Sequence, residues 1–116
     1  MVNLWVLRYA VGVTRHDIPL CPISRTAVFI GSKWTAQIMR ELLQHERRRY
    51  QDLLESLDGI APNTLSHRLK LLEQSAIVTR EFYAENPPRA EYVLTEKGRA
   101  MGAIIQAMRD WGEKFA

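Results

Sequence analysis

The sequence contains few of the groups that catalytic and metal sites require. It has one cysteine and three histidines in 116 residues, and these four residues show no recognised metal-ligand spacing. There is no phosphate-cradling glycine loop, no nucleophile beside a general base and no pair of acids held on one element. We therefore expect no enzyme activity, no metal site and no cofactor.

Cysteine pairs and long apolar runs are missing as well. A lone Cys21 excludes an intramolecular disulfide framework and fits a reducing cytoplasm. The apolar stretch 1–13 is interrupted by Arg8, has no basic residue ahead of it and precedes no small-residue cleavage site, so we expect neither a signal peptide nor membrane association. Residues 1–20 form an N-terminal extension to which the sequence assigns no structure.

The composition is that of a single globular domain, with 47% hydrophobic and 25% charged residues. The net charge is only +3, and acidic residues match the basic ones in the middle of the chain. What favours a polyanionic partner is therefore the placement of the basic side chains and not their sum. Those central basic residues are Arg47, Arg48, Arg49, Arg68, Lys70, Arg80 and Arg89.

Helical spacing and end signals predict three helices before residue 60. A short one over 25–30 is closed by Gly31. The second, over 33–44, begins after a Ser32 cap and repeats apolar residues at i, i+4 and i+8. The third covers 50–57 and ends at Gly59, and the charged run 45–49 separates it from the second.

A further helix, about 62–75, has two faces that suit different partners. Leu65, Leu69 and Leu72 form an apolar stripe, and Pro62 fits its first turn. Polar side chains lie opposite the leucines, and a lone helix of this kind fits the DNA major groove. We interpret it as the recognition helix of a helix-turn-helix, with Asn63, Ser66, His67 and Lys70 as base or phosphate contacts.

After this helix the pattern changes to that of strands. Residues 77–83 and 90–94 are rich in β-branched and aromatic residues and flank Glu85–Arg89, a proline-containing turn. This predicts a β-hairpin, the wing, over about 77–94, with Arg89 held on a stiff turn from which it can reach a minor groove or a phosphate. Thr95 then caps one long helix over 96–116. The fold class is mainly α with a β-hairpin wing, a winged helix-turn-helix.

The last helix carries a seam of large apolar residues at spacings of three and four. So close to the C-terminus, Trp and Phe would have little of their own chain to cover them, so we expect a homodimer through this helix. Two recognition helices related by a two-fold axis would meet a pseudo-palindromic operator. The seam comprises Met101, Ile104, Met108, Trp111 and Phe115, with Ile105 beside it.

A series of segments resembles HxlR-type winged-helix transcriptional regulators in order and spacing, over residues 21–115. The resemblance implies a domain over 21–95, a dimerisation helix over 96–116, and a homodimer that binds double-stranded operator DNA. It also implies that Cys21, beside a helix start that favours a thiolate, senses oxidants or electrophiles; a merely structural thiol is the alternative. The segments are Cys21–Ile23, Ile30–Trp34, Arg49–Leu53, Gly59–Leu69, Pro87–Tyr92 and Leu94–Gly98.

Thr64, Arg68, Arg49 and Lys33 are further candidate DNA contacts, although Arg68 lies near the leucine stripe and could equally pair inside the domain. The chain departs from the family at Ser75-Ala76, where a glycine usually ends the recognition helix, so either Ala76 adopts a left-handed cap or the helix ends differently. His45–Arg48 also replaces a more usual Gly-Pro. The alternative function is a winged-helix module that binds protein, and the small-molecule effector is not specified by the sequence.

Overall fold

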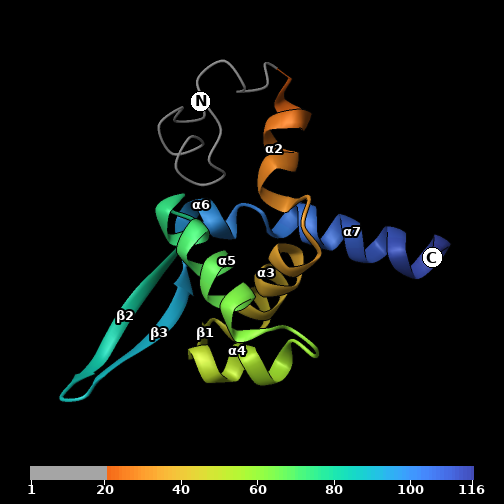
Figure 1. Cartoon of the computed structure of the whole chain (residues 1–116). Coiled ribbons are helices and arrows are strands. Elements are labelled where there is room, and N and C mark those ends of the chain that lie inside the picture. The colour runs from red at the N-terminus through yellow and green to blue at the C-terminus, as the bar shows by residue number, and fades with distance from the viewer. Residues whose placement is uncertain (1–20) are drawn as a thin grey trace.

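Helix α3 (Lys33–His45) runs through the middle of the molecule and supplies much of its core. The computed structural model describes residues 21–116, and α3 buries Ile38, Met39 and Leu42 completely or nearly so. Helices α4 (Tyr50–Ser56) and α5 (Pro62–Gln74) pack against it and form the helix-turn-helix (Figure 1). The predicted winged helix-turn-helix fold is confirmed. None of the described helices is both long and apolar enough to cross a bilayer.

The leucine stripe of α5 lies where the sequence predicts. Leu65, Leu69 and Leu72 are buried in the common core, so the opposite face of the helix is turned to solvent. In the turn before α5, Gly59 has a φ of 85°, a conformation that glycine adopts without a steric cost. The turn brings α5 across α3, with Pro62 in its first turn.

The end of α5 settles the question raised by the missing glycine. Ala76 has a φ of 59° and so adopts the left-handed cap. Its N–H donates to the carbonyl of Glu73 (3.0 Å), and the N–H of Ile77 donates to that of Leu72 (2.9 Å). This is the Schellman pattern, and it satisfies carbonyls that the helix end would otherwise leave unpaired.

Within residues 21–116 the sheet has three strands, so the predicted two-stranded wing was incomplete. Strands β2 (Val78–Glu85) and β3 (Pro88–Leu94) form the hairpin, and β1 (Arg47–Arg48) adds to the other edge of β3 in the order β1-β3-β2. Glu46, at φ 60°, reverses the chain after α3, so that Arg47 lies opposite Val93. Arg89 also differs from expectation, because it lies within β3 opposite Ala84 and not in the turn.

The closing helix is broken into α6 (Glu96–Arg99) and α7 (Gly102–Phe115), whereas the sequence pattern predicted one continuous helix. The predicted cap is confirmed, since the Thr95 hydroxyl accepts a hydrogen bond from Gly98 N–H (3.1 Å). At the break, Met101 N–H donates to the carbonyl of Gly98 (3.0 Å), three residues back. Gly98 and Gly102 on either side favour helix poorly, which explains the break.

Helix α2 (Pro22–Ile30) begins three residues before the predicted 25–30 and has no buried residue. Figure 1 shows it rising from the rest of the domain, with only its last turn near α3. Ser32 does occupy the cap position of α3, but its hydroxyl makes no capping hydrogen bond. The contacts of α2 with the body of the domain are therefore few.

Candidate nucleic-acid interface

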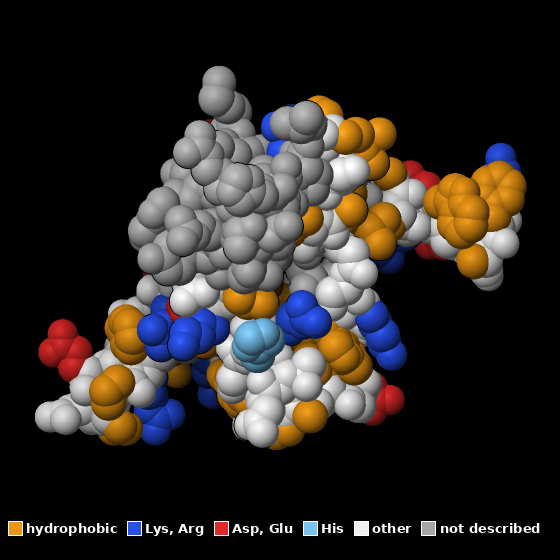
Figure 2. Space-filling model, turned by 45° about the horizontal axis from the view of Figure 1, so that its top comes forward, with side chains coloured by type: hydrophobic (Ala, Val, Ile, Leu, Met, Phe, Trp, Pro, Cys, Tyr) orange, Lys and Arg blue, Asp and Glu red, His pale blue; other side chains and the backbone are white. Residues whose placement is uncertain are grey.

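The solvent face of α5 presents four polar side chains along its first turns. Asn63, Ser66, His67 and Lys70 are all exposed, and Thr64 lies half-buried at the edge of this face. Figure 2 shows lysine and arginine side chains on either side of a histidine across this region of the surface. Amide, hydroxyl, imidazole and ammonium groups can bond base edges and phosphate oxygens.

The start of α5 is held in place by Tyr50, a residue that the sequence reasoning did not assign to the site. The Tyr50 hydroxyl donates to the carbonyl of Pro62 (3.0 Å) and accepts from the hydroxyl of Ser66 (3.3 Å). Ser66 is thus oriented by α4 while one side of its oxygen stays exposed. The signal in the sequence was a tyrosine in the first turn of the preceding helix.

The wing is joined to α5 by an ion pair. Arg80 on β2 contacts Glu73 on α5 (Nε–Oε1 2.6 Å), and its guanidinium lies 5.6 Å from the centre of the Phe82 ring. Because alternate residues of a strand share a face, Phe82 lies on the side of the wing that faces α5. Phe82 and Tyr83 are 58% and 51% exposed. Sequence reasoning missed both, although paired aromatics beside a proline turn were a visible signal.

Two of the three arginines of the charged run, Arg49 and Arg47, are engaged within the domain, whereas the Nε of Arg48 is buried without a hydrogen-bond partner among the described residues. Arg49 bonds both carboxylate oxygens of Asp52 (Nε–Oδ2 3.2 Å and Nη2–Oδ1 2.9 Å), which raises the pKa of Arg49 and, together with the Arg49 backbone N–H, lowers that of Asp52. Arg47 pairs with Glu81 on β2. Any contact of Arg49 with phosphate would therefore compete with its bonds to Asp52.

Arg68 and Lys33 lie apart from the polar face of α5. The Arg68 side chain lines a narrow hollow with Phe29 of α2 and Thr35 of α3, and its Nε is buried without a hydrogen-bond partner among the described residues. The Lys33 ammonium lies 4.6 Å from the centre of the Trp34 ring. Neither side chain lies beside Asn63, His67 and Lys70. Their roles as DNA contacts stay predictions without structural support.

Cys21 stands at the cap position of α2 with its thiol exposed. The backbone N–H of Ser24, and then that of Ile23, lower the pKa of the thiol below its ordinary value. The sulfur accepts no well-formed capping hydrogen bond, so the influence is that of nearby N–H dipoles. Among residues 21–116 no group of three or more histidine, cysteine or acidic side chains is placed to hold a metal ion.

The apolar seam of the closing helix divides into two parts. Ile105 is only 7% exposed and belongs to the protomer's own core, against which Met101 also packs, so it offers little surface to a partner and its dimer role stays a prediction. Met108, Trp111 and Phe115 are 46%, 62% and 63% exposed, and the rings of Trp111 and Phe115 are 5.6 Å apart. Ile104 lies between the two parts, half-buried.

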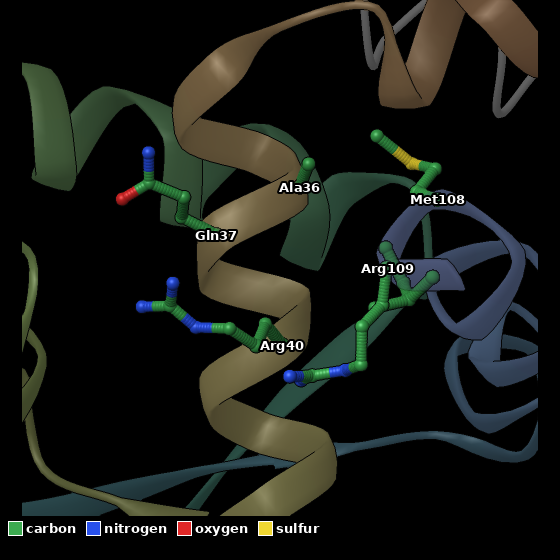
Figure 3. A pocket seen from close by; sticks show the side chains of 6 residues that line it. Ala36, Gln37, Arg40, Met108 and Arg109 are labelled. Atoms are coloured by element: carbon green, nitrogen blue, oxygen red, sulfur yellow. The ribbon is translucent and has the colours of Figure 1, made fainter. Parts of the chain in front are cut away.

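A groove of about 260 Å³ lies between α3 and α7, next to Met108. In Figure 3, the Met108 side chain points towards Ala36, and the Arg109 side chain extends towards α3, whereas Arg40 points away from α7. Its walls are formed by Ala36, Gln37, Arg40, Ile105, Met108 and Arg109.

Comparisons with known proteins identify the family. The HxlR-like helix-turn-helix family model matches residues 29–116. An uncharacterised HTH-type transcriptional regulator of Synechocystis is 39% identical over 83% of this chain and 70% of the relative, and the HTH-type regulator YodB of Bacillus subtilis is 35% identical over 83% and 86%. The redox regulator HypR in its oxidised form superposes with a TM-score of 0.76 at 33% identity, covering 83% of this chain and 98% of HypR.

These relatives do not favour the alternative of a winged helix that binds only protein. They agree with the exposed polar face of α5 and the wing beside it. From its sequence and its fold together, the chain belongs to the HxlR-like helix-turn-helix family of DNA-binding transcriptional regulators.

Proposed function

We propose that this protein is a cytoplasmic regulator that binds a pseudo-palindromic operator as a homodimer, with α5 in the major groove and the wing against the neighbouring backbone. The observation that carries the proposal is the uncommitted polar face of α5, since Asn63, His67 and Lys70 are exposed and make no hydrogen bond or ion pair within the described domain. Side chains held on a rigid helix but free of internal partners are available to a duplex.

Arg89 supports the role of the wing. It is exposed on β3 near the tip of the hairpin, and no ion pair within the described residues engages it. A cation on this strand can follow a phosphate or enter the minor groove while α5 occupies the major groove. In this arrangement Phe82, on the side of the wing that faces α5, would pack against sugar edges.

The proposal is tested by selecting duplexes from a random pool, footprinting them, and then measuring binding of four variants. Lys70→Ala and Arg89→Ala should weaken binding to all duplexes and lower the salt dependence by about one charge each. Asn63→Ala and His67→Ala should cost about 1–3 kcal/mol on the selected operator alone. Arg99→Ala removes an exposed cation from α6 and serves as the control. Wild-type binding by all four variants would show that α5 and the wing do not read DNA.

The exposed C-terminal half of the seam supports the dimer. Met108, Trp111 and Phe115 place large apolar surfaces on one end of α7, and Ile23 on α2 is 80% exposed. Apolar side chains of this size in a cluster are typical of a surface covered by a second protomer. In such a dimer the two α5 helices would be about 34 Å apart, the spacing of successive major grooves.

We also propose that Cys21 makes operator binding responsive to oxidation. The lowered pKa raises its thiolate fraction, and its exposure gives an oxidant access. HypR, a relative of the same fold, is a redox regulator solved in reduced and oxidised forms. With one cysteine per chain, oxidation by diamide would join two thiols as an intersubunit disulfide, and diamide would take up the two electrons and two protons.

Diamide should therefore change the operator affinity of wild type several-fold, and non-reducing electrophoresis should show a covalent dimer. Cys21→Ser should bind the operator normally and be insensitive to diamide. If Cys21→Ser responds as wild type does, Cys21 is only structural.

A further inference from the structure

A second hollow, of about 300 Å³, lies between α2 and the closing segment. One wall is a single face of α2, because its lining residues recur at i, i+3, i+4 and i+7. The opposite wall runs from α6 through the break to α7, and Ile77 also lines the hollow. The lining residues are Pro22, Arg25, Thr26 and Phe29 from α2, and Lys97, Ala100, Met101 and Ile104 from the closing segment.

This hollow shares Met101 and Ile104 with the predicted dimer seam, but the exposed outer part of that seam lies outside it. Ile23 and Ala27 are exposed and do not line it, and neither do Trp111 or Phe115. Because α2 buries no residue against the body of the domain, its inner face leaves space that side chains do not fill. A hollow of this size is at the lower end of the range for small-molecule sites, about 300–1,000 Å³.

The lining combines apolar side chains with positive charge that no lining acid balances. Arg25 and Lys97 are the charged residues in the walls, one on each side. The Nε of Arg25 is buried and has no hydrogen-bond acceptor among the described residues. A buried donor without a partner costs free energy, and the guanidinium to which it belongs is on a residue that lines the hollow.

Lys97, on the opposite wall, has hydrogen-bond donors that can bind a ligand. Its ammonium donates one hydrogen bond, to the carbonyl of Ser75 (2.8 Å), and lies 5.4 Å from the centre of the Phe29 ring. Partial burial lowers the pKa of Lys97. An ammonium has three donors, so two are left for a ligand.

We propose that the hollow binds a small organic carboxylate with an apolar body, its carboxylate between Arg25 and Lys97 and its body against Phe29, Met101 and Ile104. This inference rests on the proposed function, because it makes the ligand an effector of operator binding. Two cations on facing walls fix the position of the carboxylate, and the apolar walls select against small inorganic anions. A neutral ligand of the same shape would lack the negative charge that the two cations attract.

The site is connected to the recognition helix through Lys97. Ser75 is the residue at the end of α5, so the Lys97 ammonium is bonded to the terminus of the helix that carries the DNA-reading side chains. Beside it, the Thr95 hydroxyl donates to the carbonyl of Ala76 (2.6 Å). A bound carboxylate competes with the Ser75 carbonyl for the same ammonium and so changes how the end of α5 is held against α6.

Calorimetric titration with 2-naphthoate tests the site, with the neutral amide 2-naphthamide as the matched ligand. We expect one naphthoate per chain, and binding of the amide at least about tenfold weaker, since it lacks the charge-assisted hydrogen bonds. Arg25→Gln and Lys97→Gln should each weaken naphthoate by about tenfold or more. Arg99→Gln, an exposed cation on α6 outside the hollow, should bind as wild type does.

Three results would overturn the proposal: no naphthoate binding, equal binding of carboxylate and amide, or equal affinity in wild type and the two lining variants. Glutamine at position 97 can still donate to Ser75, and circular dichroism with a thermal melt verifies that each variant is folded. In operator titrations, saturating naphthoate should shift the affinity of wild type several-fold and leave Lys97→Gln unshifted. If the ligand-free protein binds no operator, the proposed function fails; if it binds operator but ignores naphthoate, only this effector site fails.

Discussion

At the scale of single residues, the recognition helix ends on a residue poorly suited to its conformation. Ala76 has a φ of 59°. A residue with a Cβ loses about 1–2 kcal/mol of stability in this left-handed conformation. Substitution by glycine removes this strain, but the greater freedom of glycine in the unfolded chain lowers the stability by about 0.4–1 kcal/mol. We predict that Ala76→Gly raises the free energy of unfolding by up to about 1 kcal/mol, measured by urea denaturation.

Ala100 provides the control for this substitution. Its φ of −61° and ψ of −20° are right-handed, so Ala100→Gly should lower the stability. Equal effects of the two substitutions would mean that the left-handed cap carries no strain.

The start of α4 depends on the charge of one carboxylate. Asp52 accepts from the guanidinium and the backbone N–H of Arg49, and its pKa is held below the ordinary 3.8. Since folding favours the charged form, this stabilisation is complete above the pKa of the unfolded chain and is lost as pH falls through the folded pKa. We predict that Asp52→Asn lowers stability at pH 7 and that the difference from wild type shrinks below pH 3.8.

Urea denaturation at pH 7 and at pH 3 measures this difference. Glu55→Gln, on the same helix, is the matched control, because among the described residues Glu55 accepts a hydrogen bond from the Gln51 amide and from no cation. If the difference in the free energy of unfolding between Asp52→Asn and wild type stayed constant over the whole pH range, the charge of Asp52 would not be what stabilises the start of α4.

The sequence predicted which side chains of α5 are exposed but not what they touch. Helical periodicity was enough to separate Asn63, His67 and Lys70 from the leucines, because burial of one stripe exposes the opposite one. It could not show that Arg49 is bonded to Asp52, or that Arg68 turns towards α2 and α3. Such pairings depend on the rotamers of long side chains and on neighbours distant in the chain.

At the scale of elements, α6 packs so closely on the start of the wing that one position requires glycine. A Cβ at Gly98 would lie 2.2 Å from the backbone oxygen of Ile77 and 3.0 Å from a methyl of Leu94. We predict that Gly98→Ala forces α6 away from the wing and lowers the free energy of unfolding by about 1–3 kcal/mol. Gly112→Ala, where a Cβ meets nothing within 4 Å, should instead raise the stability of α7. The two variants are compared by thermal and urea denaturation.

Elements with a strong period were predictable, and elements created by tertiary contacts were not. The helices α3, α4 and α5 match the predicted ranges within one residue, since each repeats apolar residues on one face. Strand β1 has two residues inside a charged run, which carries no period, and it forms only because Glu46 turns the chain towards β3. The break between α6 and α7 was missed because the apolar seam continues through it.

At the scale of the whole molecule, three of the large exposed apolar side chains among the described residues, Met108, Trp111 and Phe115, lie together on the outer part of α7. We predict that the double variant Trp111→Ser, Phe115→Ser is monomeric in sedimentation and keeps its fold, because both side chains are outside the core. Its operator affinity should fall by about a hundredfold or more, since two linked half-sites bind far more tightly than one.

The double variant Glu113→Gln, Lys114→Gln changes polar residues of the same turn and should remain dimeric. A dimeric Trp111→Ser, Phe115→Ser protein would show that the two protomers meet on another surface, with the exposed Ile23 of α2 as the next residue to change.

Strand β1 affects how the binding of an effector or the oxidation of Cys21 could change DNA binding. It fastens the chain before α4 to β3, while the pair of Glu73 and Arg80 fastens α5 to β2. We therefore expect the recognition helix and the wing to move together, and in the proposed dimer an effector or a disulfide would act by changing the distance between the two such units. The distance between the two recognition helices would then have to match the distance between the two half-sites of the operator. Lengthening the operator spacer by half a helical turn, about five base pairs, should abolish binding even when both half-site sequences are intact.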